Sequence, residues 1–429
     1  MKILIVLDNP KRDLDSVCLV AAELKKHHDV AISFMSNLKF AIFHYNPDHV
    51  ILNYLRVSNE KVAQLLLDLK IEYSVLDTEG GLFARLSNGE TSFTKTLVKN
   101  DLITKHLKYY FCWGENIFNY LKEVQVYPTE GVLLTGTPRT DIYYYLRNTQ
   151  KNLVGKRPYV LVNTSFPLIN PKYSTPEKEI EMLVSKFNYT NEYINERVSF
   201  VKKVQSDYIA LTIFLAEKFP ELDFIFRPHP FENEAYYYSY FSKYSNIKVI
   251  CEGTVANWIN ESILLIHFEC STAIEAALLG KVSLSLSKYK DVFPLIETYP
   301  YTIFCDSFDD IASAILKEKA CESVLSRDLD FADIYYKVDG KAYSRIAKAF
   351  LDKKVTLNRP PLSPMKKGFF IVYTYFKNLI KKYVIDAKKP SKEILPSELE
   401  SAFKIARDMT GSSITFRAIW KRLYWVVEN

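Results

Sequence analysis

Several features are scarce in this chain of 429 residues, and each scarcity excludes a class of protein. Glycine occurs only 12 times, and no GxGxxG fingerprint of dinucleotide-binding enzymes is present. The six cysteines are scattered without a CxxC pair, which argues against zinc binding and favours buried free thiols. Residues 1–7 form a strand-like segment rather than a signal peptide, and no run of ~18 apolar residues occurs. The sequence therefore predicts a cytoplasmic protein.

The composition is that of a large globular protein. Hydrophobic residues make up 48% of the chain, including 30 tyrosines and 27 phenylalanines, so it has ample material for a core. A chain of this length favours two domains of ~150–200 residues. The formal charge is +6, and 13 Lys/Arg against 6 Asp/Glu lie from Pro360 onward, so the basic character belongs to the tail. Mixed with aromatic residues, this charge favours a membrane surface as partner over nucleic acid.

Two series of alternating strands and helices predict the architecture. In the first series, the strand-like segments are 2–7, 30–33, 49–52, 71–76, 109–113 and 132–135, with helices between them. A hydrophilic connector precedes the second series, whose strand-like segments are 159–163, 223–226, 248–251, 264–267, 282–286 and 302–304. Such alternation predicts parallel sheets covered by helices. We therefore expect an α/β protein with two tandem Rossmann-like domains, 1–150 and 157–345, in the glycosyltransferase-B (GT-B) architecture.

The remaining residues, 346–429, are predicted to form a basic helical extension. After a proline-rich break, the stretch 367–383 carries apolar residues at helical spacing with lysines beside them. Two interpretations stay open for this stretch. It packs back on a domain, or it attaches the protein to the anionic inner face of the cytoplasmic membrane.

The segment Arg227-Pro228-His229-Pro230 follows a buried strand and predicts an anion site. Two prolines restrict the backbone, and a guanidinium and an imidazole at a strand end can both donate to a phosphate. The carboxyl ends of strands are where ligands bind in α/β sheets. The alternative is structural, with Arg227 paired to Glu232 or Glu234.

A second group of candidate residues follows the strand 264–267. Ser271 and Thr272 stand where a helix begins, so hydroxyl and backbone N–H groups can converge on an anion there. Glu275, one turn later, is a candidate for contacts with ribose hydroxyls. The alternative is an ordinary capping box formed by Ser271 and Glu275.

A third group, Asn163-Thr164-Ser165, follows the first strand of the second domain. We expect Asn163 and Ser165 to contact the phosphate or the transferred sugar, although a plain turn explains the same residues.

The first domain offers acidic residues at the end of the strand 71–76. Asp77 and Glu79 stand beside Gly80 and Gly81, a pattern suited to a general base that deprotonates an acceptor hydroxyl. A solvated acidic turn is the alternative, and of the two carboxylates Glu79 is slightly favoured.

Arg139 and Asp141 follow Gly136 at the end of the last predicted strand of the first domain, 132–135. They are candidates for lining the site or for a structural ion pair with each other.

These segments resemble a family of bacterial surface-carbohydrate biosynthesis enzymes related to sialyltransferases and Kdo transferases. The matching pieces span roughly residues 70–290 and are 77–81, Trp113-Gly114, 136–141, 227–230 and 271–276. The resemblance implies that His229 and Pro230 contact the phosphate of a cytidine nucleotide, and that Asp77 or Glu79 supplies the catalytic carboxylate. Thr78 separates the two acids, where many relatives have adjacent carboxylates. His-Pro turns are also found in CDP-glycerol phosphotransferases.

The resemblance implies a metal-independent glycosyltransferase that moves a nonulosonic acid or Kdo-type sugar from a CMP-activated donor onto a surface glycan. The CMP-sugar is a substrate, and no separate cofactor is expected. His229 would also protonate the leaving phosphate. Two rival interpretations are a CDP-glycerol-type phosphotransferase and a nucleotide-binding protein that has lost catalysis.

Overall fold

The computed structural model divides into two compact units that are described separately. The first unit comprises Met1–Tyr145 with Asp330–Asn429, and the second comprises Leu146–Leu329. The structure describes residues 1–78, 96–149, 157–187, 190–268, 270–290, 296–320, 330–351, 365, 368–369, 371–373, 376, 394–420 and 423–428.

The first unit is built on an eight-stranded sheet with the order β13-β14-β2-β1-β3-β4-β5-β6. The strands are β1 (Lys2–Leu7), β2 (Asp29–Phe34), β3 (His49–Leu52), β4 (Glu72–Leu76), β5 (Leu107–Cys112), β6 (Val132–Leu134), β13 (Ile414–Trp420) and β14 (Leu423–Glu428). The described helices are α1 (Pro10–Lys25), α2 (Leu38–Tyr45), α3 (Glu60–Asp68), α4 (Asp101–His106), α5 (Glu115–Val124), α6 (Pro138–Asn148), α13 (Ala342–Lys348) and α15 (Pro396–Thr410), with short 3-10 turns η1 (Met35–Asn37), η2 (Val57–Asn59) and η4 (Thr129–Gly131). The strands β1 to β6 are parallel.

The sequence explains why these central strands form. In β1, every residue from Ile3 to Leu7 is buried, and β3 and β4 are buried along their whole length. Strands that are buried along their whole length are typical of parallel sheets that helices cover on both faces. The carboxyl ends of β1, β3, β4, β5 and β6 therefore meet at one edge of the sheet.

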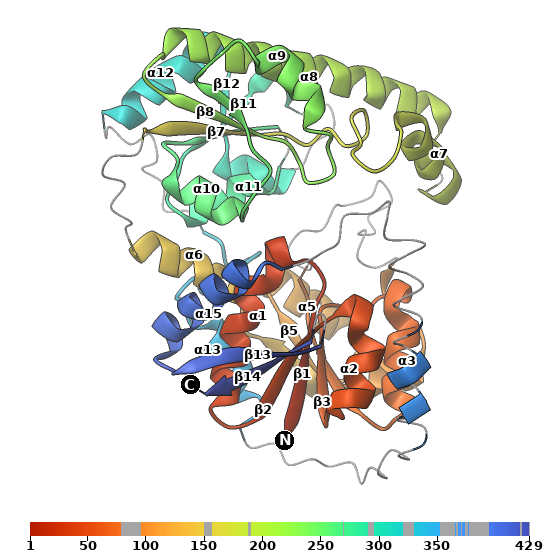
Figure 1. Cartoon of the computed structure of the whole chain (residues 1–429). Coiled ribbons are helices and arrows are strands. Elements are labelled where there is room, and N and C mark those ends of the chain that lie inside the picture. Colours follow the sequence, from red (N-terminus) through yellow and green to blue (C-terminus); the bar gives the residue numbers. More distant parts are fainter. Residues whose placement is uncertain are drawn as a thin grey trace. The chain divides into compact units, whose positions relative to one another are not determined.

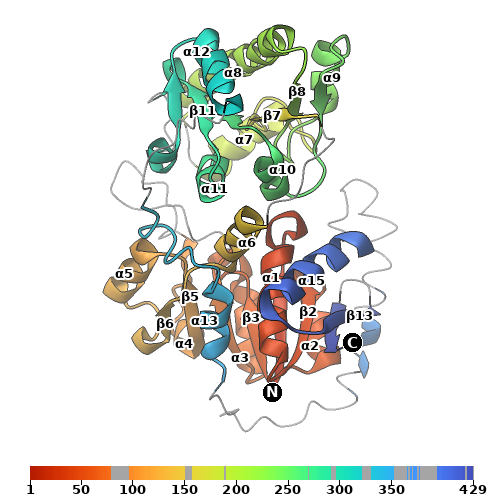
Figure 2. The same ribbon diagram turned by 90° about the vertical axis from the view of Figure 1, so that its left-hand side faces the viewer.

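The C-terminal residues complete the first unit and include strands as well as a helix. Strands β13 and β14 form an antiparallel hairpin, and β14 pairs antiparallel with β2 at the edge of the sheet. Helix α15 packs against α1, and Figures 1 and 2 both show the two side by side. The expected helical extension therefore contains α15, and the tail also supplies two strands that the sequence did not predict, with β13 at the edge of the sheet. The stretch 367–383 lies mostly outside the described residues.

The second unit contains a six-stranded parallel sheet with the order β12-β11-β10-β7-β8-β9. Its strands are β7 (Tyr159–Asn163), β8 (Asp223–Arg227), β9 (Ile247–Val249), β10 (Leu265–His267), β11 (Ser283–Leu286) and β12 (Ile303–Cys305). Its described helices are α7 (Pro176–Phe187), α8 (Asn191–Lys218), α9 (Ala235–Phe241), α10 (Val255–Glu261), α11 (Thr272–Leu278) and α12 (Phe308–Lys319), with the 3-10 turns η5 (Ser287–Tyr289) and η6 (Ile296–Tyr301).

Helices cover both faces of this second sheet. Figure 1 shows α8 and α12 on one face and α10 and α11 on the other. The long helix α8 buries residues such as Val204, Tyr208 and Leu215 in a core that also contains Phe224 and Phe226 of β8. Its amino end is capped by Thr190, whose side chain accepts a hydrogen bond from the N–H of Tyr193. This packing fixes the strand ends that carry the candidate residues.

The compact units differ in outline from the sequence-based division at 1–150, 157–345 and 346–429. The second unit ends at Leu329, and residues from Asp330 onward pack with the first. Asp141 accounts for part of this attachment, because its carboxylate accepts hydrogen bonds from the N–H groups of Ala342 (3.0 Å) and Tyr343 (2.8 Å) at the start of α13. Among the described residues, no helix is both long enough and apolar enough to span a bilayer.

Candidate functional site

Three neighbouring strands of the second unit end in a row of polar residues. In the register of β8, β7 and β10, Asn163 lies opposite Arg227 on one side and opposite His267 on the other. The Oδ1 atom of Asn163 is buried and has no hydrogen-bond partner in the described part of the chain. A buried polar atom without a partner is costly unless water or a ligand satisfies it. The arrangement is therefore suited to binding a polar ligand at the strand ends.

Arg227 is largely occupied by the backbone of a neighbouring loop. Its two terminal nitrogens donate to the carbonyls of Glu252 (2.8 Å) and Gly253 (2.9 Å). Burial lowers the pKa of the guanidinium, and the nearby Glu275 acts in the opposite direction. The alternative pairing of Arg227 with Glu232 or Glu234 is wrong, because Glu234 pairs with Lys172 and Glu232 binds hydroxyl and N–H groups. Arg227 thus fixes the loop around residues 252–253 at this edge.

His229 is held in one orientation by its own turn. Its Nδ1 accepts a hydrogen bond from the N–H of Phe231 at 3.3 Å, and its backbone N–H donates to the carboxylate of Glu232 at 2.9 Å. Burial lowers the pKa of the imidazole below its usual value, so the ring is neutral at pH 7. A neutral ring whose Nδ1 is an acceptor carries its proton on Nε2. His229 can therefore donate a hydrogen bond from Nε2 to an anion, while Pro230 next to it is exposed.

The residues after β10 are nearby but do not form the capping box. Ser271 is the N-cap residue of α11 and makes no side-chain capping hydrogen bond. Thr272 is buried, and its Oγ1 has no hydrogen-bond partner of good geometry among the described residues. Burial raises the pKa of the nearby Cys270 thiol, and Thr272 acts in the opposite direction. Glu275 is also buried and lies close enough to Arg227 to affect its pKa. The strand register brings Asn163 and Arg227 together at this edge, and the electrostatic contact places Glu275 beside them.

His267, next along the same edge, has a structural role. Thr302 donates its hydroxyl to the carbonyl of Thr298 (2.9 Å), so it accepts from His267 Nε2 (3.1 Å). The remaining ring nitrogen, Nδ1, accepts from the N–H of Cys270 at 3.4 Å. With both ring nitrogens bonded and the ring 1% exposed, burial lowers its pKa to about 4. His267 therefore links β10 to the β12 side of the sheet as a neutral residue.

The loop after β7 also carries candidate residues. Thr164 is buried and donates its hydroxyl to Glu232, whereas Ser165 is half-buried. Glu232, which sequence reasoning treated only as a salt-bridge partner for Arg227, accepts hydrogen bonds from both this loop and the His229 turn.

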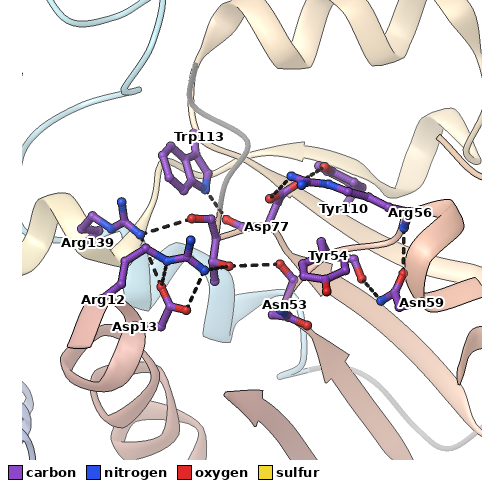
Figure 3. Close-up of polar contacts among 11 residues, drawn as sticks. Arg12, Asp13, Asn53, Tyr54, Arg56, Asn59, Asp77, Tyr110, Trp113 and Arg139 are labelled. Carbon is purple, nitrogen blue, oxygen red and sulfur yellow. Dashed lines mark hydrogen bonds and ion pairs between the residues drawn. The ribbon is translucent and has the colours of Figure 1, made fainter. Parts of the chain in front are cut away.

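The first unit gathers a separate polar cluster at the carboxyl ends of its strands (Figure 3). Asp13, at the start of α1, pairs with Arg12 (2.7 Å) and with Arg139 at the start of α6 (3.3 Å). Arg12 and Arg139 also donate to the hydroxyl and the carbonyl of Thr78, at 3.0 and 3.2 Å. The guanidinium of Arg139 stacks over the Trp113 ring at 5.2 Å. Arg139 therefore pairs with Asp13, and the alternative of an Arg139–Asp141 pair is wrong.

Asp77 lies at the centre of this cluster, and both its carboxylate oxygens and its backbone carbonyl have partners. Its carboxylate accepts a hydrogen bond from the Tyr110 hydroxyl at 2.5 Å and lies 3.5 Å from a terminal nitrogen of Arg56. Its backbone carbonyl accepts the indole N–H of Trp113. Asp77 is only 2% exposed, and Glu79, Gly80 and Gly81 lie outside the described residues.

Sequence reasoning missed several members of this cluster, notably Arg12, Asp13, Asn53 and Arg56. Asn53 directly follows β3, is 1% exposed, and has no hydrogen-bond partner for either side-chain amide atom in the described part of the chain. Its backbone carbonyl accepts the N–H of Thr78 at 3.0 Å. For Asn53 the available signal was its position directly after a buried strand, whereas Arg12 and Asp13 lie in the first turn of α1 and Arg56 lies four residues beyond β3. Among the described residues, no group of three or more His, Cys, Asp or Glu side chains is arranged to hold a metal ion.

Comparison with known proteins identifies the fold. No protein-family model matches this chain, and a search of curated proteins found no similar sequence. The solved structure of UDP-GlcNAc 2-epimerase from Neisseria meningitidis bound to UDP-GlcNAc has a TM-score of 0.52 and 15% identity, covering 82% of this chain and 100% of that one. The UDP-GlcNAc 2-epimerase from Methanocaldococcus jannaschii has a TM-score of 0.50 and 15% identity, covering 81% and 99%.

Similarity at these identities establishes the fold. The predicted class is confirmed: this is an α/β protein of two tandem Rossmann-like domains in the GT-B architecture, with a C-terminal region that contains helix α15.

Proposed function

We propose that this chain is an enzyme that acts on a nucleotide-activated sugar bound at the strand ends of the second unit. The proposal depends on two polar groups at this edge, a hydrogen-bond donor held in one orientation and a buried acceptor that no described residue satisfies. His229 presents its Nε2 proton, and Asn163 Oδ1 has no partner among the described residues. Both residues lie at the carboxyl ends of strands, where ligands bind in α/β sheets. A sugar nucleotide offers phosphate oxygens to the first and hydroxyl groups to the second. The Neisseria meningitidis structure with UDP-GlcNAc bound supports a ligand of this class.

The finer proposal is transfer of a nonulosonic acid or Kdo-type sugar from its CMP conjugate onto a bacterial surface glycan. It rests on the resemblance of Arg227-Pro228-His229-Pro230 to the His-Pro turn of CMP-sugar transferases. An acceptor hydroxyl attacks the anomeric carbon of the sugar, and the bond from that carbon to the phosphate oxygen breaks. CMP leaves with the electron pair, and the hydroxyl proton passes to a carboxylate.

The residues would divide these tasks between them. His229 would donate a hydrogen bond from Nε2 to the leaving phosphate and stabilise its charge, and because the ring is neutral it would not transfer that proton, contrary to the expectation from the sequence. Ser271 and Thr272 would contribute hydroxyls, and Glu275 would hold the ribose. Arg227 would act by fixing the loop around residues 252–253. In the first unit, Glu79 or Asp77 would be the base. We propose that the reaction needs neither a metal nor a separate cofactor, and unchanged turnover in EDTA would support this.

A donor panel tests the proposal. The purified full-length chain is incubated with CMP-activated nonulosonic acids, CMP-Kdo, CDP-glycerol and UDP-GlcNAc, and release of nucleotide or epimerised sugar is followed by chromatography. We expect release of CMP from one CMP-sugar acid and none in a His229→Ala variant. Turnover of CDP-glycerol alone would establish the phosphotransferase alternative, and epimerisation of UDP-GlcNAc would replace transfer by isomerisation. Nucleotide binding without turnover of any donor would favour an inactive relative.

We also propose that the tail attaches the enzyme to the inner face of the cytoplasmic membrane. Large apolar side chains in the described part of residues 365–376 are exposed, including Met365 (84%), Phe369 (67%) and Phe376 (57%). Lysines are frequent in the surrounding sequence. Apolar side chains together with basic ones are typical of segments that bind anionic lipid surfaces.

A further inference from the structure

The carboxylate of Glu232 lies at the centre of the hydrogen bonds that shape the site in the second unit. It is completely buried and accepts hydrogen bonds from four residues. The hydroxyl of Thr164 (2.9 Å) and the N–H groups of Phe166 (2.9 Å) and His229 (2.9 Å) all donate to Oε1. The hydroxyl of Tyr237 donates to Oε2.

These donors come from the two loops that carry the candidate ligand contacts. Thr164 and Phe166 follow β7 and Asn163, whereas His229 follows β8. Tyr237 lies on α9 and in turn accepts a hydrogen bond from Gln205 of α8 at 3.0 Å. A single side chain thus joins the loop after β7, the turn after β8 and two helices.

Burying the Glu232 carboxylate costs free energy, and its hydrogen bonds must offset that cost. In the described part of the chain no lysine or arginine pairs with Glu232, so the four hydrogen bonds alone compensate for its burial. Burial raises the pKa of the carboxyl, and the hydrogen bonds act in the opposite direction. Buried carboxylates are retained at a cost, and accepting several donors at once is what makes one tolerable.

The hydrogen bonds of Glu232 fix the turn that carries His229. Its backbone N–H is fixed by Glu232, and the N–H of Phe231, two residues on in the same turn, then reaches Nδ1 of the imidazole. The backbone carbonyl of His229 also accepts the N–H of Glu232 at 2.7 Å, which closes the turn. Resting on the proposed function for the role of His229, we infer that Glu232 is the positioning residue of this site. It holds the turn so that Nδ1 is an acceptor and Nε2 carries the proton toward the ligand.

Substitutions at Glu232 test whether this residue orients the His229 turn or only packs in the core. Glu232→Ala removes all four acceptor contacts. Glu232→Gln keeps one side-chain oxygen. This oxygen can still accept hydrogen bonds from the Thr164 hydroxyl and from the N–H groups of Phe166 and His229, which bind Oε1 in the unsubstituted protein. Glu234→Ala is the matched control, because Glu234 is a partly exposed neighbour that pairs with Lys172 at 2.7 Å.

The direct readout is the tautomer and titration of the His229 ring by ¹⁵N nuclear magnetic resonance, assigned with a His229→Asn variant. In the unsubstituted protein and in the Gln and Glu234→Ala variants, we expect one species protonated on Nε2. In Glu232→Ala we expect a mixture of tautomers and a CMP affinity lower by about tenfold or more. The Gln variant should bind CMP within about threefold of the unsubstituted protein.

An unchanged Nε2–H tautomer together with unchanged CMP affinity in folded Glu232→Ala would overturn the inference. If circular dichroism shows that the alanine variant is unfolded, Glu232→Asp takes its place with the same expected and contradicting results, since its shorter carboxylate cannot reach both loops. The tautomer is measured without nucleotide. A protein that fails to bind CMP would therefore contradict the proposed function and still test the positioning role.

Discussion

The hydroxyl of Tyr110 donates a hydrogen bond to the carboxylate of Asp77 at 2.5 Å inside the first unit. Arg56 lies 3.5 Å from the other carboxylate oxygen, and the side chain is almost fully buried. A carboxylate with these partners is well placed to hold β4 and β5 together at their ends. The relationship therefore favours Glu79 over Asp77 as the base in the proposed reaction.

Substitutions at the two acids should have different effects. Asp77→Asn places an amide where the carboxylate accepts Tyr110 and faces Arg56, and we expect it to destabilise the protein by about 1–3 kcal/mol. Glu79→Gln should leave the melting temperature and CMP affinity unchanged while lowering sugar transfer by about 10²–10⁴-fold. Thermal melting and steady-state transfer rates measure the two effects. Full transfer activity in Glu79→Gln would exclude Glu79 as the base.

The stability of the second unit should depend on pH through His267. Burial lowers the pKa of His267 to about 4, whereas the unfolded residue titrates near ~6.5. The unfolded chain therefore binds more protons than the folded one between these values, so this contribution is complete above pH ~6.5 and is lost as the pH falls toward 4. At pH ~5 the loss amounts to about 2 kcal/mol in the free energy of unfolding.

Urea unfolding at pH 5 and pH 7.5 measures this loss. His267→Asn, which can still donate to Thr302, should show a pH dependence smaller by about 2 kcal/mol. His27→Asn, at an exposed position, is the control and should behave like the unsubstituted protein. An equal pH dependence in all three proteins would show that His267 does not titrate as described.

The C-terminal hairpin should be required for the stability of the first unit. Strand β14 pairs with β2, and the residues Leu399, Phe403 and Leu423 are buried. Removing residues 394–429 exposes this surface and the unpaired edge of β2, so we expect a lower melting temperature and aggregation. Light scattering during a thermal ramp measures both. A monomeric product with an unchanged melting temperature would contradict the structural role of the hairpin.

Because the hairpin has this role, membrane binding is better tested by point substitutions than by truncation. Phe369→Ser with Phe376→Ser should weaken binding to vesicles that contain anionic lipid by about tenfold or more, and leave the melting temperature unchanged. Co-sedimentation with such vesicles, and with neutral ones, measures the effect. The matched control is Leu102→Ser, an exposed residue at 73% in the first unit. Equal sedimentation of all variants would remove the membrane proposal.

The fold was largely predictable because its central strands are short, mostly apolar segments that alternate with helices. The strand expected at 2–7 coincides with β1, and the strand expected at 159–163 coincides with β7. The hairpin was not foreseen, because β13 (Ile414–Trp420) mixes an arginine and small residues with apolar ones, and because its partner β14 pairs with β2, a strand almost 400 residues earlier. Pairing of such distant edge strands depends on the finished sheet, and no local periodicity encodes it.

The candidate site was predictable in location and less so in detail. The predicted strand ends pointed to Asn163, His229 and Asp77, and the structure has these residues at or just after the carboxyl ends of β7, β8 and β4. Which carboxylate faces which donor depends on side-chain packing, so the role of Glu232 and the pairing of Arg139 with Asp13 had no sequence signal. The spacing of Arg139 and Asp141 suggested a local pair, but both lie on the first turn of a helix and have different partners.

Titration of the full-length protein with CMP by isothermal calorimetry tests the central claim most directly. We predict saturable binding with one site per chain. We also predict a loss of affinity of about tenfold or more in His229→Ala, because in the proposed function Nε2–H of His229 donates to the phosphate. His27→Ala is the control and should bind as the unsubstituted protein does. Absence of saturable CMP binding, or equal affinity in His229→Ala, would contradict the account.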